Sequence, residues 1–158
     1  GDVLKGVVAV CLGRWLFSHL PADAAISPYL GVYLAAILAV VGHSKPIYFG
    51  FKGGKGVLVA AGAILAVQPV LLPVLAVIFL ACLLPTGMVS LGSITMAAAY
   101  PVLTLIYGLL RGFAADDLIV CVVGAAIMGG MVIWMHRTNI QRIRDGKEYR
   151  FGQKHKSK

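Results

Sequence analysis

The stretch LIVCVVGAAIMGGMVIWM, residues 118–135, decides the fold class. It is 18 residues long without a charge, close to the about 20 apolar residues that a helix needs to cross a bilayer. Five further apolar runs precede it, at residues 3–20, 29–41, 57–67, 70–84 and 94–110. Because a helix satisfies its backbone polar groups internally, we expect an all-α integral membrane bundle with about six membrane-embedded helical segments.

Some of these segments are short for a full crossing. The pair that meets at Gln68-Pro69 is the shortest, so we expect it to be tilted or to enter the membrane only partway. The chain is 59% hydrophobic and 13% charged, with a mean hydropathy of +0.89, and a soluble domain is about 25% charged. Within 158 residues we expect one membrane domain, residues 1–151, and a basic cytoplasmic tail, residues 152–158.

The basic residues sort to one face if each run crosses once. Twelve of the fourteen Lys and Arg residues then share a face, and Arg14 and Arg111 are left out. The other face holds Asp23, Asp116 and Asp117. The positive-inside rule therefore predicts that the basic face is cytoplasmic. No aromatic and basic stacking surface accompanies the charge, so nucleic acid is not an expected partner.

A glycine-lysine segment lies on this basic face. It consists of Gly42-His43-Ser44-Lys45-Pro46 and Phe51-Lys52-Gly53-Gly54-Lys55-Gly56-Val57. Glycine lets backbone N–H groups approach an anion and lysine adds compact positive charge, which favours a phosphate site beside the lipid. The alternative is a charged loop that only fixes membrane orientation. It is not a Walker A loop, because Phe49 stands where that motif requires glycine.

Two other polar clusters share the same face. Val89-Ser90-Leu91-Gly92-Ser93 opens the fifth expected helix, where helix capping by serine is the simpler explanation. His136-Arg137-Thr138-Asn139-Ile140-Gln141-Arg142 follows the sixth, and its simpler explanation is a cationic segment at anionic headgroups. The gathering of Ser, His and Asn at one depth instead favours a polar site at the lipid boundary. No metal or cofactor is expected, since no ligand cluster is evident.

These clusters together resemble the bacterial acyl-phosphate:glycerol-3-phosphate acyltransferases, the PlsY family. The matching elements, in order, are Asp2-x-x-Lys5-Gly6, Gly42-His43-x-x-Pro46 with Phe51–Val57, Val89-Ser90-Leu91-x-Ser93, His136-x-x-Asn139-Ile140-x-Arg142 and Gly146-x-Glu148. The resemblance covers residues 2 to about 151. The family's first helix and its Ser/Gly/Asn-rich loop with a phosphate-binding Arg have no counterpart here, so we expect an N-terminally truncated member, and an inactive fragment is the alternative to an active one.

The resemblance implies a reaction at the cytoplasmic face of the bacterial inner membrane. An acyl group moves from acyl phosphate to the sn-1 hydroxyl of glycerol 3-phosphate, which gives lysophosphatidic acid for phospholipid synthesis. The implied partners are these two substrates and membrane lipid, with no obligatory protein partner. The implied catalytic residues are His136, Lys55 and Asn139; the implied substrate-binding residues add His43, Lys52, Gly53, Gly54, Ser90 and Ser93.

Two alternatives stay open from the sequence. His136 either orients glycerol by hydrogen bonding, with the acyl phosphate taking the proton, or it is a general base. A small anion-binding transporter or channel subunit is the alternative function, although the chain shows no internal repeat and its polar clusters gather at one face.

Overall fold

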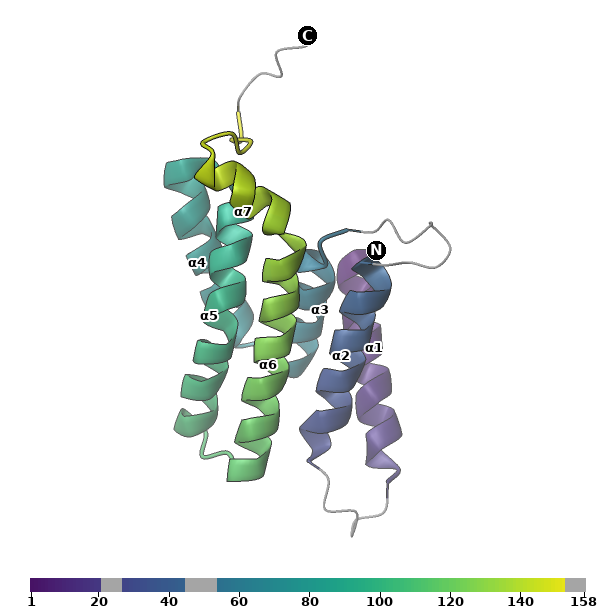
Figure 1. Ribbon diagram of the computed structural model, residues 1–158. Coiled ribbons are helices and arrows are strands. Elements are labelled where there is room, and N and C mark those ends of the chain that lie inside the picture. The colour runs from purple at the N-terminus through teal and green to yellow at the C-terminus, as the bar shows by residue number, and fades with distance from the viewer. Residues whose placement is uncertain (21–26, 45–53, 153–158) are drawn as a thin grey trace.

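The computed structural model describes residues 1–20, 27–44 and 54–152, and these contain seven helices and no strand (Figure 1). The helices are α1 (Asp2–Ser18), α2 (Pro28–Ser44), α3 (Val57–Val67), α4 (Leu71–Thr86), α5 (Val89–Leu110), α6 (Ala115–Met135) and α7 (Arg137–Arg144). The six longer helices run side by side and α7 lies across one end. The expected all-α bundle is confirmed.

The helices differ in how far they reach through a bilayer. By length and composition, α5 and α6 can cross a membrane, whereas α2, α3 and α4 are shorter apolar helices. With 11 residues, α3 is about 16 Å long, roughly half of a hydrocarbon core. The turn after α3 accordingly lies short of the level of the α5–α6 turn in Figure 1. The expected short segment is therefore α3, while α4 has 16 residues.

The fifth helix begins at the serine cluster, as expected, but the serines do not cap it. It starts at Val89, with Met88 as N-cap and no side-chain cap hydrogen bond. Ser93 Oγ instead donates to the Val89 carbonyl oxygen at 3.0 Å. A serine hydroxyl that donates to the carbonyl four residues earlier has its hydrogen-bond partner inside its own helix and does not cap the helix start. The capping explanation is therefore wrong for this cluster.

Glycines bring α1 and α3 into close contact. A Cβ on Gly6 would overlap the backbone of α3 at Val59, and a Cβ on Gly62 would overlap the backbone of α1 at Val3. Small residues that let backbones approach are the usual means of helix association in lipid. The Asp2-x-x-Lys5-Gly6 element therefore has a packing role at its glycine.

Two polar contacts lie at the C-terminal end of α3, and no sequence pattern predicted them. Arg14 donates to the carbonyl oxygen of Ala66 at 3.0 Å, one of the last carbonyls of α3, which have no partner within their own helix. Buried Thr104 donates to Gln68 at 3.2 Å, directly after α3. These bonds supply polar partners at the C-terminal end of the short helix α3.

The connections alternate between the two ends of the bundle as expected. The N-terminus, the end of α2, the α4–α5 turn and α7 lie towards one end, and the α5–α6 turn lies at the other (Figure 1). At that other end Ser27 donates to Asp117 at 2.6 Å, which joins the start of α2 to the start of α6. Three of the sequence clusters thereby share one end.

Candidate functional site

A cleft of about 930 Å³ opens at the end of the bundle that carries α7. Its walls come from the starts of α3 and α5, from α4, and from α7 with the segment after it. The lining residues are Lys55, Val57, Leu58, Phe79, Val89, Ser90, Ser93, His136, Asn139, Arg142, Lys147, Glu148 and Tyr149. One wall is thus apolar and the other carries charges of both signs.

The start of α3 gives this cleft an anion-binding character. Gly56 caps the helix with φ of +72° and no side-chain hydrogen bond. This left-handed conformation suits glycine, and a Cβ there would press on Val40. Free N–H groups at a helix start attract phosphate, and the exposed side chain of Lys55 stands immediately before them. Within the described residues Lys55 forms no ion pair.

Glu148 holds the other wall together. Its Oε1 accepts hydrogen bonds from Ser90 Oγ and from Asn139 Nδ2, each at 2.6 Å. Its Oε2 accepts from Arg142 Nε at 2.9 Å. The carboxylate therefore joins the start of α5, helix α7 and the segment after α7, and its side chain is only 5% exposed.

These contacts keep Glu148 ionised. Burial on its own would raise the pKa of this carboxyl, but the three hydrogen bonds outweigh burial and lower the pKa to about 2. Arg142 thus has its charge compensated, which leaves Lys55 and Lys147 as the remaining basic side chains in the lining. The cleft keeps a positive balance that suits an anionic ligand.

His136 lies at the break between α6 and α7 and is 2% exposed. Its Nδ1 lies 2.7 Å from the carbonyl oxygen of Val132, and since a carbonyl only accepts, Nδ1 carries the proton. Burial lowers the pKa of His136, and the positive charge of Lys55 lowers it further. The hydrogen bond to Val132 raises the pKa but does not outweigh burial. The neutral ring consequently keeps Nε2 as a hydrogen-bond acceptor.

Ser93 and Asn139 are buried in the same lining, at 3% exposure each. Asn139 uses its Nδ2 on Glu148, while its Oδ1 has no hydrogen-bond partner among the described residues. Ser93 donates to Val89, so to donate to a phosphate it would have to rotate away from that carbonyl. Its oxygen can accept a hydrogen bond without that change.

The other expected site residues fall elsewhere. The described residues that line the cleft include neither His43 nor Gly54. Nδ1 of His43 lies 3.6 Å from Asp2 Oδ1, and the ring of His43 occupies the place that a Cβ on Gly54 would need. Lys52 and Gly53 lie outside the described residues. The structure thus brings Lys55, Ser90, Ser93, His136 and Asn139 together in one cleft.

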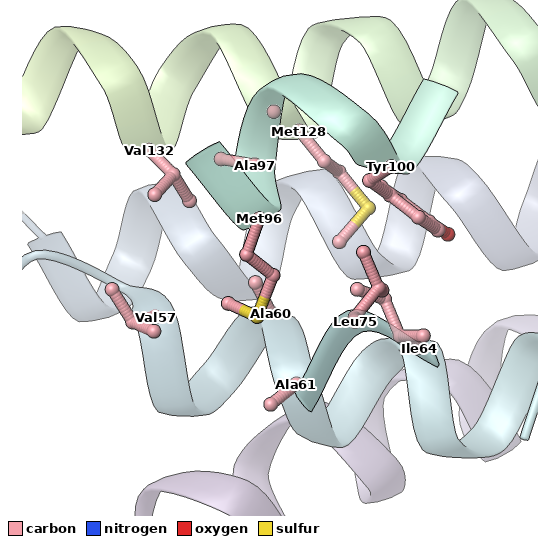
Figure 2. A pocket seen from close by; sticks show the side chains of 11 residues that line it. Val57, Ala60, Ala61, Ile64, Leu75, Met96, Ala97, Tyr100, Met128 and Val132 are labelled. Carbon is pink, nitrogen blue, oxygen red and sulfur yellow. The ribbon is translucent and has the colours of Figure 1, made fainter. Parts of the chain in front are cut away.

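An apolar slot lies beside the cleft, between α3, α4, α5 and α6 (Figure 2). Val57 lines both the slot and the cleft. Figure 2 shows Val57 and Val132 at one end, the methionines Met96 and Met128 along the wall, and Tyr100 at the far end. The slot is narrow, with a cavity volume of about 20 Å³.

Four polar lining residues were absent from the set expected from sequence: Arg142, Lys147, Glu148 and Tyr149. Arg142 and Glu148 belong to the last two sequence elements that resemble the family, His136-x-x-Asn139-Ile140-x-Arg142 and Gly146-x-Glu148. That resemblance marks the two residues as candidates but does not indicate what they contact. Only the fold shows that Glu148 returns to Ser90, 58 positions earlier.

The fold and the cleft together define a helical membrane protein that presents a basic, phosphate-suited site at one end of its bundle. The glycerol-3-phosphate acyltransferase family model matches residues 1–146. The chain therefore belongs to the glycerol-3-phosphate acyltransferase family, whose solved member PlsY is an integral membrane protein.

Individual relatives agree with this membership. The chain is 39% identical over 148 residues to the glycerol-3-phosphate acyltransferase of Syntrophomonas wolfei, with coverage of 94% of this chain and 67% of the relative. It is 40% identical over 153 residues to that of Synechococcus elongatus, with coverage of 97% and 69%. The chain thus spans about two thirds of the length of these relatives.

The fold of the chain is also similar to that of a solved member of the family. The chain resembles crystalline PlsY in its glycerol 3-phosphate form with a TM-score of 0.72 and 30% identity. That alignment covers 96% of this chain and 68% of PlsY. The lysophosphatidic acid form aligns with a TM-score of 0.59 and 27% identity.

Proposed function

We propose that this protein transfers an acyl group from acyl phosphate to the sn-1 hydroxyl of glycerol 3-phosphate. The hydroxyl oxygen bonds to the acyl carbon, the bond from that carbon to the phosphate oxygen breaks, and inorganic phosphate leaves. Lysophosphatidic acid remains in the membrane. The observation that carries this proposal is a single cleft that combines Lys55 at a helix start with buried His136 and an apolar wall.

The basic side of the cleft fits the two phosphates. Lys55 and the N–H groups at the start of α3 bind phosphate oxygens in this proposal, because a helix start and an ammonium both favour negative charge. Lys52, Gly53 and Gly54 extend the same cradle, as the family resemblance implies. Ser93 borders the cradle from α5.

The acceptors in the cleft fit the glycerol hydroxyl groups. Nε2 of the neutral His136 ring can accept a hydrogen bond from a hydroxyl, and Asn139 is held in place by Glu148. Ser90, expected to bind substrate, donates to Glu148, so we assign it to support of this wall. His43, also expected to bind substrate, lies beside Asp2 and outside the cleft lining.

The leaving phosphate takes the hydroxyl proton in this mechanism. His136 is neutral and could accept it, but its Nδ1 partner is the Val132 carbonyl rather than a carboxylate. A carboxylate partner would stabilise the charged ring that a general base must become. We therefore assign His136 to orientation of glycerol 3-phosphate.

We place the reaction at the cytoplasmic face of the bacterial inner membrane. The described residues at the α7 end include Arg137, Arg142, Arg144, Lys147 and Arg150, whereas Asp116 and Asp117 are at the other end. The positive-inside rule assigns the basic end to the cytoplasm. Water-soluble glycerol 3-phosphate reaches the cleft from there and the acyl donor reaches it from the lipid.

Acyl donor choice tests the proposal directly. The purified full-length protein in lipid vesicles is given radiolabelled glycerol 3-phosphate with palmitoyl phosphate, palmitoyl-CoA or palmitoyl-acyl carrier protein. Lysophosphatidic acid should form with palmitoyl phosphate alone. Product from a thioester donor would contradict the donor assignment, and uptake of glycerol 3-phosphate into vesicles without product would support the transporter alternative.

A further inference from the structure

The slot of Figure 2 has the chemical character of a hydrocarbon site. Apart from the ring of Tyr100, its lining is aliphatic side chains, methionine and glycine. Figure 2 shows the hydroxyl of Tyr100 directed away from the other lining side chains. A buried water needs two to four polar partners, which this lining does not offer. The slot therefore suits an apolar occupant.

The slot and the polar cleft are adjacent, since they share one lining residue. Val57 lines both spaces at the start of α3, one residue after Gly56 and two after Lys55. A lipid whose phosphate lies at Lys55 would thus have its hydrocarbon within reach of the slot. We propose that the slot receives the methyl end of the donor acyl chain and limits its length, which rests on the function proposed above.

A polar floor sets the limit. The hydroxyl of Tyr100 lies 3.2 Å from that of Tyr33, and both rings are buried. Buried Thr104 is bonded to Gln68, and Nε2 of Gln68 has no partner among the described residues. Pushing a methylene past Tyr100 would separate hydrogen-bonded hydroxyls without replacing their partners, which is unfavourable. A chain that is too long would therefore bind poorly.

The length of the slot follows from α3. Its lining extends from Val57 to Ile64, which is about 10 Å along the helix axis. With about 20 Å³ of cavity, occupancy requires Met96 and Met128 to turn aside. Methionine has three rotatable bonds and readily adapts its shape, so these two side chains act as adjustable walls rather than as a fixed block.

A matched pair of methionine variants tests the slot. The full-length protein carrying Met128→Ala is compared with Met131→Ala, which removes the same volume from a partly buried position outside the slot lining. kcat/KM is measured for acyl phosphates of increasing chain length. Met128→Ala should raise the preference for donors longer than the wild-type optimum, by about fourfold for each additional methylene that becomes buried. Equal profiles for the two variants would overturn the inference.

A second variant fills the slot and protects the test against a folding defect. Ala61 lines the slot from a half-buried position, so Ala61→Leu should be accommodated. It should reduce kcat/KM for long donors at least fourfold more than for short donors. If Leu58→Ala and Phe79→Ala change the length profile while the slot variants leave it unchanged, the chain lies along the outer wall of the cleft and the inference is wrong. Absence of transfer from every acyl phosphate in the wild type would instead overturn the proposed function, and this inference with it.

Discussion

Ser90 and Glu148, 58 residues apart in sequence, are joined by a hydrogen bond of 2.6 Å. The bond connects the first turn of α5 with the segment that follows α7. Asn139 and Arg142 use the same carboxylate. The second and third sequence clusters are therefore physically one wall, and Glu148 is the group that makes them so.

Replacing Glu148 by Gln should weaken this wall. Glutamine removes the charge that Arg142 faces, and a hydrogen bond to a charged group contributes about 1.5–3 kcal/mol, so we expect the free energy of unfolding to fall by that order. Thermal unfolding in detergent measures the change. Asp145→Asn, at an exposed carboxylate that accepts from Gln141, should have little effect.

The stability difference between the wild type and Glu148→Gln should depend on pH. Because the folded pKa of Glu148 is about 2 and lies below the usual 4.5, its stabilisation is fully present above about pH 4.5 and is lost as the pH falls towards 2. The difference in unfolding temperature between wild type and Glu148→Gln should shrink over this window. A constant difference down to the lowest accessible pH would show that the charge of Glu148 is not what stabilises the wall.

Lys55→Ala should reduce kcat/KM for acyl transfer at least tenfold while expression and helix content stay unchanged. The reason is loss of a charged hydrogen bond to phosphate, which is worth about 1.5–3 kcal/mol. Steady-state kinetics on the full-length protein measure the effect. Arg144→Ala removes a charge from an exposed position outside the cleft lining and should retain activity. Near-normal activity of Lys55→Ala would remove this residue from the phosphate cradle.

His136→Gln and His136→Asn separate orientation from base catalysis. If His136 only accepts a hydrogen bond from substrate, an amide oxygen can replace Nε2 in part. Activity should then largely recover at high glycerol 3-phosphate. A general base would instead cost roughly 10²–10⁴ in kcat even at saturation.

The pH profile of the wild type adds a second measure of His136. Because burial lowers the pKa of the ring, Nε2 stays a hydrogen-bond acceptor at pH 7. It becomes protonated, and stops accepting, only as the pH falls below that lowered pKa. KM for glycerol 3-phosphate should rise in that range, and kcat should change little. A fall in kcat without a change in KM would favour the base.

Gly62→Ala should destabilise the bundle because a Cβ there meets the α1 backbone at Val3. Overpacking of this kind costs about 1–3 kcal/mol. Gly130→Ala is the matched control, since a Cβ on that α6 glycine meets nothing within 4 Å. Unfolding temperatures of the two variants in detergent should differ clearly. Equal values would mean that α1 and α3 can separate without penalty.

Impermeant cysteine labelling tests the orientation. Single cysteines at Ser44, Gly87 and Ser157 should react only from the cytoplasmic side, and one at Asp116 only from outside. The expectation follows from the positive-inside rule and the alternation of connections. Labelling of Gly87 from outside would place the α4–α5 turn on the wrong face for a shared site.

Much of the bundle could be predicted from sequence because lipid allows few alternatives to helices. The apolar run at residues 118–135 and the other runs predict the helices, including α3, whose bounds agree with the expected ones. The role of the serines at the start of α5 was predicted wrongly, because serine is a good helix cap, yet Ser93 bonds inside its own helix. A single residue type supports both arrangements, and only the packed structure selects one.

The candidate site was predictable in membership but less so in roles. Lys55, Ser93, His136 and Asn139 lie in one cleft as their shared depth suggests. The role of Glu148 depends on a contact between distant segments, and the partner of His136 is a backbone carbonyl, which no sequence pattern displays. Tertiary contacts of these kinds have no local signature.

The bond between Arg14 and Ala66 bears on how the chain enters the membrane during synthesis. Arg14 is made 52 residues before Ala66, so the donor for this carbonyl near the end of α3 is already in place when that short helix emerges from the ribosome. The wall around Glu148 has the opposite order, since its central carboxylate is made after all six long helices. The scaffold can thus assemble during translation, whereas the site closes only at its end.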